Sequence, residues 1–175
     1  MQKRMILGGC AVLLLAAVPA LAQNSVRTAG SKISGSAFRE WSAQSYRTSA
    51  YGHATALDEY SRTYTHIPEE TAKEHAAEIR RNVTSVKKEM EKLAPQAKAD
   101  KTLAKHIETI NAKYDKVLAD CTVVETEAAK GEKADHKKVT DASARMAADL
   151  KAADADHKTL GAHLKSLEKA APAKK

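Results

Sequence analysis

Two histidines, a cysteine and a methionine are the residues of this sequence best suited to bind a soft metal ion. They are His53, His75, Cys121 and Met146. Imidazole suits copper and zinc, and thiol and thioether groups select Cu(I), so together these side chains would form a copper-type site. His106 and His157 are a second possible pair of metal ligands. All six residues lie far apart in the sequence, so any site depends on the elements that carry them.

Four long helices are the expected elements. About half of the 175 residues are Ala, Lys, Glu, Leu or Arg, a composition typical of long helices when apolar residues recur every three or four positions. Aromatic residues make up only 4% of the chain and there are two cysteines, which argues against β-sandwiches, barrels, α/β enzymes and disulfide scaffolds. The recurrence predicts helices over residues 37–64, 69–94, 98–129 and 133–169.

The breaks between these segments are short. Pro68 is followed by two glutamates, as at the start of a helix, and Pro95 and Gly131 interrupt the next two boundaries. Short connections make consecutive helices antiparallel. We therefore predict an all-α fold over residues 37–169, an antiparallel up-down-up-down four-helix bundle with long Ala/Lys/Glu-rich helices. A closed bundle and an extended pair of hairpins both fit the pattern.

Apolar stripes along the segments define the expected core. The stripe of the first segment contains Tyr46, Ala50, His53, Leu57, Tyr60 and Tyr64. Those of the other three contain Ala72, Ala76, Ile79, Val83, Val86, Met90 and Leu93; Leu103, Ile107, Ile110, Tyr114, Val117, Cys121, Val124 and Ala128; and Val139, Ala142, Met146, Leu150, Ala153, His157, Leu160, Leu164 and Leu167. We expect the aromatic residues of the first segment in the core, with an exposed docking face as the alternative.

Counting along the helices places the candidate ligands at similar heights. With a rise of about 1.5 Å per residue, the four soft ligands fall within about 9 Å along the bundle axis. His106 and His157 share a level on neighbouring helices. Metal binding is one interpretation; the other is that Met and Cys fill the core and that the histidines are hydrogen-bonded there, for example to Tyr46 or Tyr60.

Residues 1–22 have the features of a secretory signal peptide. Lys3 and Arg4 precede an apolar run that ends at a small-x-small cleavage site, Ala20-Leu21-Ala22. The run is shorter than the about 20 residues that cross a bilayer, so a transmembrane anchor is the less favoured alternative. A lipobox-like sequence ends at Cys10 and makes lipoprotein processing a second, less favoured alternative, because the apolar run continues beyond it.

Cleavage would leave a secreted or periplasmic chain with no transmembrane segment. Its net charge would fall from +7 to +5 because Lys3 and Arg4 are removed, and Cys121 would be its lone thiol. Residues 23–36 are polar and rich in Gly and Ser, which predicts a flexible leader. Residues 170–175 are expected to form a disordered tail.

Catalytic motifs are absent from the sequence, which has no GxSxG, P-loop or HExxH and no ExxH pair of a di-iron bundle. Its charges are interspersed, as on solvated helix faces, and the export signal argues against a nucleic-acid partner. We expect an exported, non-enzymatic bundle that binds a protein or another component of the cell envelope. The alternative is a periplasmic metal-binding bundle that uses its inward His, Cys and Met side chains to hold copper or zinc. A homo-oligomer also remains open.

Three stretches carry a resemblance to known proteins. They are Tyr51-Gly52-His53-Ala54, the segment Lys73-Glu74-His75-Ala76-Ala77-Glu78-Ile79-Arg80-Arg81-Asn82-Val83, and Ala104-Lys105-His106. These stretches resemble uncharacterised secreted bacterial helical-bundle proteins, and the resemblance would cover most of the chain after residue 22. It implies export and a helical bundle, and it implies no activity.

Overall fold

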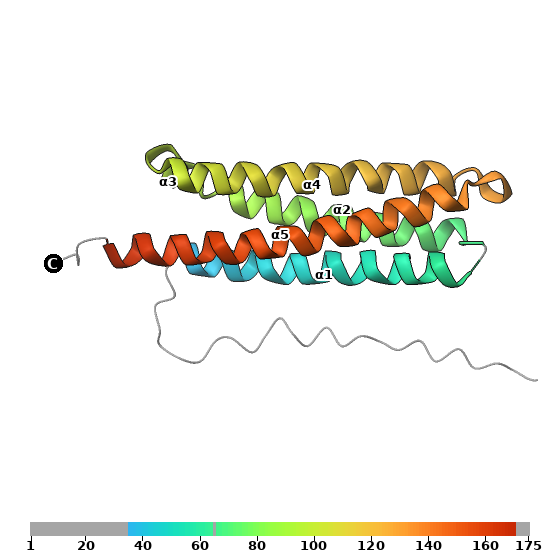
Figure 1. Ribbon diagram of the computed structural model, residues 1–175, viewed down its shortest axis with the longest axis horizontal. Coiled ribbons are helices and arrows are strands. Elements are labelled where there is room, and N and C mark those ends of the chain that lie inside the picture. Colours follow the sequence, from blue (N-terminus) through green and yellow to red (C-terminus); the bar gives the residue numbers. More distant parts are fainter. Residues whose placement is uncertain (1–34, 65, 171–175) are drawn as a thin grey trace, which may run out of the picture. The chain divides into compact units, whose positions relative to one another are not determined.

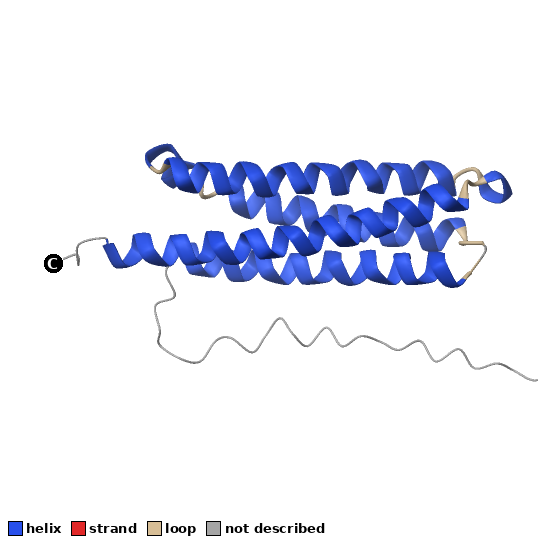
Figure 2. Cartoon of the chain, viewed as in Figure 1, coloured by secondary structure: helices blue, strands red, loops and turns tan. Residues whose placement is uncertain are grey.

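The structure is a computed structural model that describes residues 35–64 and 66–170, with side chains described from Ser42 onward. The predicted signal peptide, most of the predicted leader, Cys10, the residues beyond Ala170 and the side chains of Phe38 and Trp41 lie outside the described residues. The described chain is helical and contains no strand (Figure 2). Its helices are α1 (Gly35–Thr63), α2 (Glu69–Glu91), α3 (Ala94–Ala99), α4 (Lys101–Ala128) and α5 (His136–Ala170), with a short 3-10 helix, η2 (Gly131–Lys133).

The four long helices run antiparallel in sequence order and form a closed bundle (Figure 1). Helix α1 packs against α2 and α5, and α4 packs against the same two helices. This arrangement confirms the predicted all-α antiparallel bundle and selects the closed form over extended hairpins. None of the helices within the described ranges is long and apolar enough to cross a membrane.

The connection between α2 and α4 contains a short helix that the sequence pattern did not predict. Helix α3 has Pro95 in its first turn, a position where a missing N–H costs nothing. Asp100 then begins α4, because its Oδ1 accepts hydrogen bonds from the backbone N–H groups of Thr102 and Leu103 at 2.8 and 2.9 Å. The sequence predicted a single break at Pro95. The structure has instead the short helix α3 there, with a break in the helix on each side of it.

The turn between α4 and α5 is built on Gly131 and Glu127. Gly131 has a φ of +57°, a conformation that glycine adopts without strain. Glu127 is buried, and its carboxylate accepts hydrogen bonds from Lys130 Nζ at 2.7 Å and from the backbone N–H of Asp135 at 3.2 Å. These contacts hold the pKa of Glu127 below its ordinary value. The carboxylate thus ties the end of α4 to the start of α5.

The predicted stripes of α2, α4 and α5 are confirmed as core. Every residue in them is buried except Ile107, which is half-buried against the core, and Leu167, which is exposed. Large aliphatic side chains dominate these stripes, and burying each of them removes apolar surface from water. The hydrophobic interior is therefore supplied mainly by three of the four long helices.

Helix α1 presents a different face from the predicted one. Apart from Leu57, its buried side chains are small or polar; the full set is Ala43, Arg47, Ala50, Ala54, Leu57 and Ser61. The predicted stripe shares only Ala50 and Leu57 with this set. Tyr46 and Tyr64 expose 38% and 53% of their surface, Tyr51 exposes 40%, and Tyr60 is half-buried. The expectation that the tyrosines of the first segment fill the core was wrong for three of the four.

The small side chains of α1 explain this difference. Two stripes with the same spacing run through Ala50 and Leu57, one lined by tyrosines and one by alanines. With the alanines inward, α1 can approach α2 and α5 closely, and the larger rings remain at the surface. Stripe spacing alone does not distinguish these two rotations of a helix.

Two glycines allow a matched test of the local backbone. A Cβ added at Gly52, inside α1, or at Gly131 meets no atom within 4 Å, so the two sites differ in backbone conformation and not in space. Gly52→Ala is expected to stabilise the protein by about 0.5–1 kcal/mol because alanine favours helix. Gly131→Ala is expected to destabilise it by about 1 kcal/mol because its φ is positive. Urea denaturation of both variants measures the changes; shifts of the same sign would contradict this account.

Candidate functional site

His53 and His75 meet across the interface between α1 and α2. Their Nδ1 atoms are 3.1 Å apart, and their ring centroids are 5.3 Å apart with an angle of 63° between the planes. Both side chains are half-buried. Since a neutral imidazole carries one N–H and one lone pair, one Nδ1 donates a hydrogen bond and the other accepts it.

Burial lowers the pKa of His75 below its ordinary value, and the neighbouring His53 lowers it further. The adjacent Glu74 acts weakly in the opposite direction. His75 is therefore a neutral imidazole at neutral pH, with a lone pair available on one ring nitrogen. This contact is the only described one in which two imidazole nitrogens approach to hydrogen-bonding distance.

Cys121 and Met146 meet across the interface between α4 and α5. The Cys121 thiol lies 3.5 Å from Met146 Sδ, and both residues are fully buried. Burial raises the pKa of the Cys121 thiol to about 12. The thiol is therefore protonated at neutral pH, whereas metal binding needs the thiolate.

The predicted four-ligand site is thus two separate contacts, one between histidines and one between sulfur groups. Within the part of the chain that the structure describes, no three His, Cys, Asp or Glu side chains come together as a group that could hold a metal ion. Each predicted pair shares a level along the bundle, but the two pairs occupy different interfaces.

His106 and His157, the second predicted pair, have other neighbours. His157 is fully buried, and its Nε2 lies 2.9 Å from the hydroxyl of Tyr114, which is also fully buried. The ring of His106 lies 5.9 Å from that of His163, whose Nε2 is 2.9 Å from Asp100 Oδ2. Tyr114 therefore takes the role that the sequence interpretation gave to Tyr46 or Tyr60.

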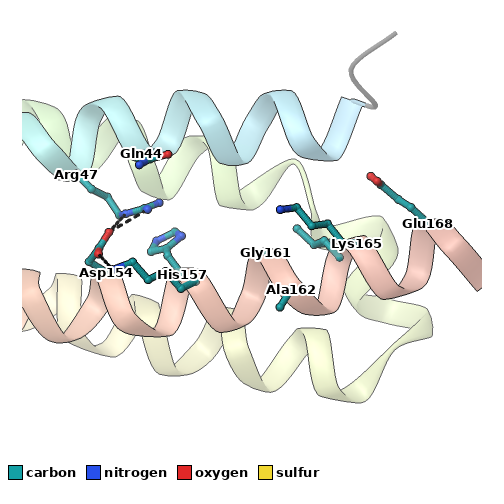
Figure 3. Close-up of a pocket in the computed structure, with 10 residues that line it drawn as sticks. Gln44, Arg47, Asp154, His157, Gly161, Ala162, Lys165 and Glu168 are labelled. Carbon is teal, nitrogen blue, oxygen red and sulfur yellow. Dashed lines mark hydrogen bonds and ion pairs between the residues drawn. The ribbon is translucent and has the colours of Figure 1, made fainter. Parts of the chain in front are cut away.

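A groove between α1 and α5 is the candidate binding site that the sequence did not indicate (Figure 3). Its main part has a volume of about 510 Å³, and an adjoining part of about 500 Å³ shares four residues with it, Gln44, Arg47, Asp154 and Lys158. We call both parts together the α1–α5 groove. Its remaining lining residues are Thr48, Tyr51, Leu150, Lys151, Ala155, His157, Gly161, Ala162, Leu164, Lys165 and Glu168.

Arg47 is the central charge of the α1–α5 groove. It is only 5% exposed and reaches from α1 toward Asp154 on α5, where its Nη2 lies 3.1 Å from Oδ1 (Figure 3). Lys158 Nζ lies 3.0 Å from the other carboxylate oxygen. Although burial raises the pKa of Asp154, hydrogen bonds from Lys158 and Arg47 outweigh this effect and hold it below its ordinary value. Asp154 is therefore a carboxylate at neutral pH.

A signal for Arg47 is present in the sequence. It follows Ala43 by four residues and precedes Ala50 by three, so it stands on the alanine stripe of α1. A charged residue on an inward stripe needs a partner of opposite charge, and the half-buried Asp154 supplies it. The tyrosine stripe of α1 has the same spacing and bulkier side chains, so the sequence pattern favours that stripe over the one that contains Arg47.

All four interfaces between neighbouring helices contain such a polar contact. Going around the bundle, they are Asn82 Nδ2 to Ser49 Oγ at 3.1 Å, Arg80 Nη2 to Glu125 Oε2 at 2.8 Å, Arg145 Nη2 to Asp120 Oδ1 at 2.6 Å, and Arg47 Nη2 to Asp154 Oδ1 at 3.1 Å. Directional contacts of this kind favour one register of the helices over others. The contact between Arg47 and Asp154 lies in a groove of the size that a ligand or a peptide segment needs.

Comparisons with known proteins leave the family of the chain unidentified. No protein-family model matches it, and neither a curated protein nor a solved structure matches it.

Proposed function

We propose that this chain is an exported, non-enzymatic helical-bundle protein that binds an acidic segment of another cell-envelope protein in the α1–α5 groove. The observation that carries the proposal is the position of Arg47, a nearly buried cation in the wall of an open groove. Tyr51 is exposed beside it. Arginine and tyrosine are the residue types that most often dominate binding energy at protein interfaces.

The charge of the α1–α5 groove supports an acidic partner. Its lining includes four cationic side chains, Arg47, Lys151, Lys158 and Lys165, against two carboxylates, Asp154 and Glu168. The lining also contains apolar or small residues, Leu150, Gly161 and Ala162. A segment with carboxylates beside an apolar side chain complements this surface, and charge complementarity speeds association and excludes other partners.

The use of the ionisable groups supports a binding role without catalysis. Asp120 and Asp154 form ion pairs across interfaces between helices. Glu127 forms an ion pair with Lys130, in the turn that follows α4. His157 is fully buried in the wall of the groove, where its Nε2 lies against the Tyr114 hydroxyl. Asp154 and His157 line the groove but are held in these structural contacts, so recognition there would rest on its cationic side chains and Tyr51.

Photo-crosslinking in the cells that produce the protein tests this proposal. A photo-reactive amino acid at Gln44, in the α1–α5 groove, is expected to capture an envelope protein, and the same group at Lys88, exposed on α2, is expected to capture none. Charge reversal by Lys151→Glu with Lys165→Glu should lower the yield about 3- to 10-fold. The matched reversal Lys88→Glu with Lys116→Glu should leave the yield unchanged.

Two results would contradict the proposal. Equal crosslinking from Gln44 and Lys88 would show that capture does not depend on the groove. A yield that both charge reversals change equally would show that only net charge matters. Mass spectrometry of the recovered protein also reads its N-terminus, and export by the predicted signal peptide requires a chain that begins at Gln23.

A further inference from the structure

We infer that His53 and His75 form an open two-histidine site that binds a borderline divalent cation, Cu(II) most tightly and Zn(II) next. The site lies at the interface of α1 and α2, away from the α1–α5 groove. It is independent of the proposed partner binding and uses neither Cys121 nor Met146.

The distance between the two nitrogens fits chelation. Metal–imidazole bonds of about 2.0–2.1 Å place two ligand nitrogens about 3.3 Å apart in a tetrahedral site and about 2.9 Å apart at adjacent corners of a square. The Nδ1 atoms of His53 and His75 are 3.1 Å apart, between these two values. A cation would therefore sit beside the line that joins the nitrogens. It would take the place of the proton between them, which moves to Nε2 of the ring that carried it.

The partial exposure of the pair supplies the rest of the coordination. Both imidazoles are half-buried, so water can reach a cation held between them. Because no group of three protein ligands forms in the described ranges, water must complete the shell. A structural zinc site is closed by four protein ligands, whereas a site with open positions exchanges its metal.

The other described histidine contacts lack this geometry. His157 faces a tyrosine hydroxyl inside the core, and His163 faces the carboxylate of Asp100. The rings of His106 and His163 approach to 5.9 Å between centroids without a nitrogen-to-nitrogen contact. Cys121 and Met146 are sealed in the core against each other.

The chemistry of the donors selects the metal. Two imidazoles are borderline ligands, which favour Cu(II) and Zn(II) and bind Mg²⁺ and Ca²⁺ poorly. For the same nitrogen donors, affinity rises along the first-row series to Cu(II) and falls at Zn(II). The carboxylate of Glu74, next to His75 in the chain, adds negative charge near the cation.

Titration of the full chain with Cu(II), Zn(II) and Mg(II) tests the site. Calorimetry is expected to give one equivalent of Cu(II) or Zn(II) and no Mg(II), and the melting temperature should rise with Cu(II) and Zn(II) because they bind the folded state. His53→Ala and His75→Ala should each weaken binding by about 10-fold or more, since either change removes the chelate. His106→Ala is the matched control and should bind as the unsubstituted chain does.

Spectroscopy on the unsubstituted chain gives an answer even if a variant fails to fold. Electron paramagnetic resonance of the Cu(II) complex should show coupling to two imidazole nitrogens, and nuclear magnetic resonance should show broadening of the His53 and His75 ring signals first. Coupling to one nitrogen, broadening that begins at His66 or His106, or affinity that His53→Ala and His75→Ala leave unchanged would overturn the inference. So would the absence of any Cu(II) or Zn(II) binding.

Discussion

Replacing Ile110 by aspartate is expected to unfold the protein. Ile110 lies in the middle of α4 and is fully buried among the core side chains. The substitution removes the burial of a large aliphatic group and places an unpaired carboxylate in the apolar interior, which together cost about 5 kcal/mol or more. Since small domains are stable by only about 5–15 kcal/mol, we expect loss of the helical circular dichroism signal and of a cooperative melting transition.

Thr109→Asp is the matched control for this change. Thr109 is the neighbouring residue and is exposed, so the same carboxylate remains in water. We expect its free energy of unfolding to differ from that of the original chain by at most about 0.5 kcal/mol. If both variants unfold at the same urea concentration, Ile110 does not face the core as described.

The three aliphatic stripes could be predicted from the sequence because large apolar side chains at helical spacing are stable only in the core of the bundle. In α2, α4 and α5, residues such as Ile79, Val117 and Leu160 recur at helical spacing, and no competing stripe of large apolar residues exists on the same helix. Burial of these side chains is the largest favourable term in folding. The antiparallel order followed from the short connections at Pro68, Pro95 and Gly131.

Helix α1 could not be placed in the same way. The residues of its two candidate stripes have the same spacing and differ only in the size of their side chains. The bulky tyrosines favoured the stripe that the structure leaves at the surface. The correct rotation depends on how closely α2 and α5 approach and on Asp154, which is more than a hundred residues away from Arg47. Only the tertiary structure carries that information, so the α1–α5 groove was missed with it.

The candidate metal ligands show the same limit. Counting residues along helices predicted that His53, His75, Cys121 and Met146 lie within about 9 Å along the axis, and the structure brings His53 to His75 and Cys121 to Met146. Such counting could not predict that α1 and α2 hold one pair while α4 and α5 hold the other, across separate interfaces. For His157, the inward stripe of α4 offered Tyr114, whereas His106 stands beside that stripe. Counting residues gives the height of a side chain along the bundle axis, but it does not give the direction in which the side chain leaves its helix.

The buried thiol of Cys121 leads to a large expected difference in reactivity. In a chain with Cys10→Ser, Cys121 is the only thiol. Its pKa is raised from 9.0 to about 12 by burial, so the thiolate fraction at pH 8 falls about 1000-fold relative to the unfolded chain. We therefore expect alkylation by iodoacetamide at pH 8 to be slower in the folded protein than in urea by about 100-fold or more, measured by mass spectrometry.

The pH dependence of alkylation separates this explanation from simple steric protection. With the raised pKa, the rate in the folded protein should keep rising about tenfold per pH unit beyond pH 9, whereas the rate in urea should level off near the unfolded pKa of 9.0. The same shift makes the stability of the protein depend on pH. Between pH 9.0 and about pH 12 the folded state keeps the thiol proton that the unfolded state has lost, so the free energy of unfolding falls by about 1.4 kcal/mol per pH unit over this range and is unaffected by this group below it. Cys121→Ala removes this contribution while the tyrosines and lysines still titrate, so its stability should fall less steeply over the same range. Equal slopes for the two chains, or equal alkylation rates with and without urea, would mean that the Cys121 thiol is not sealed between α4 and α5.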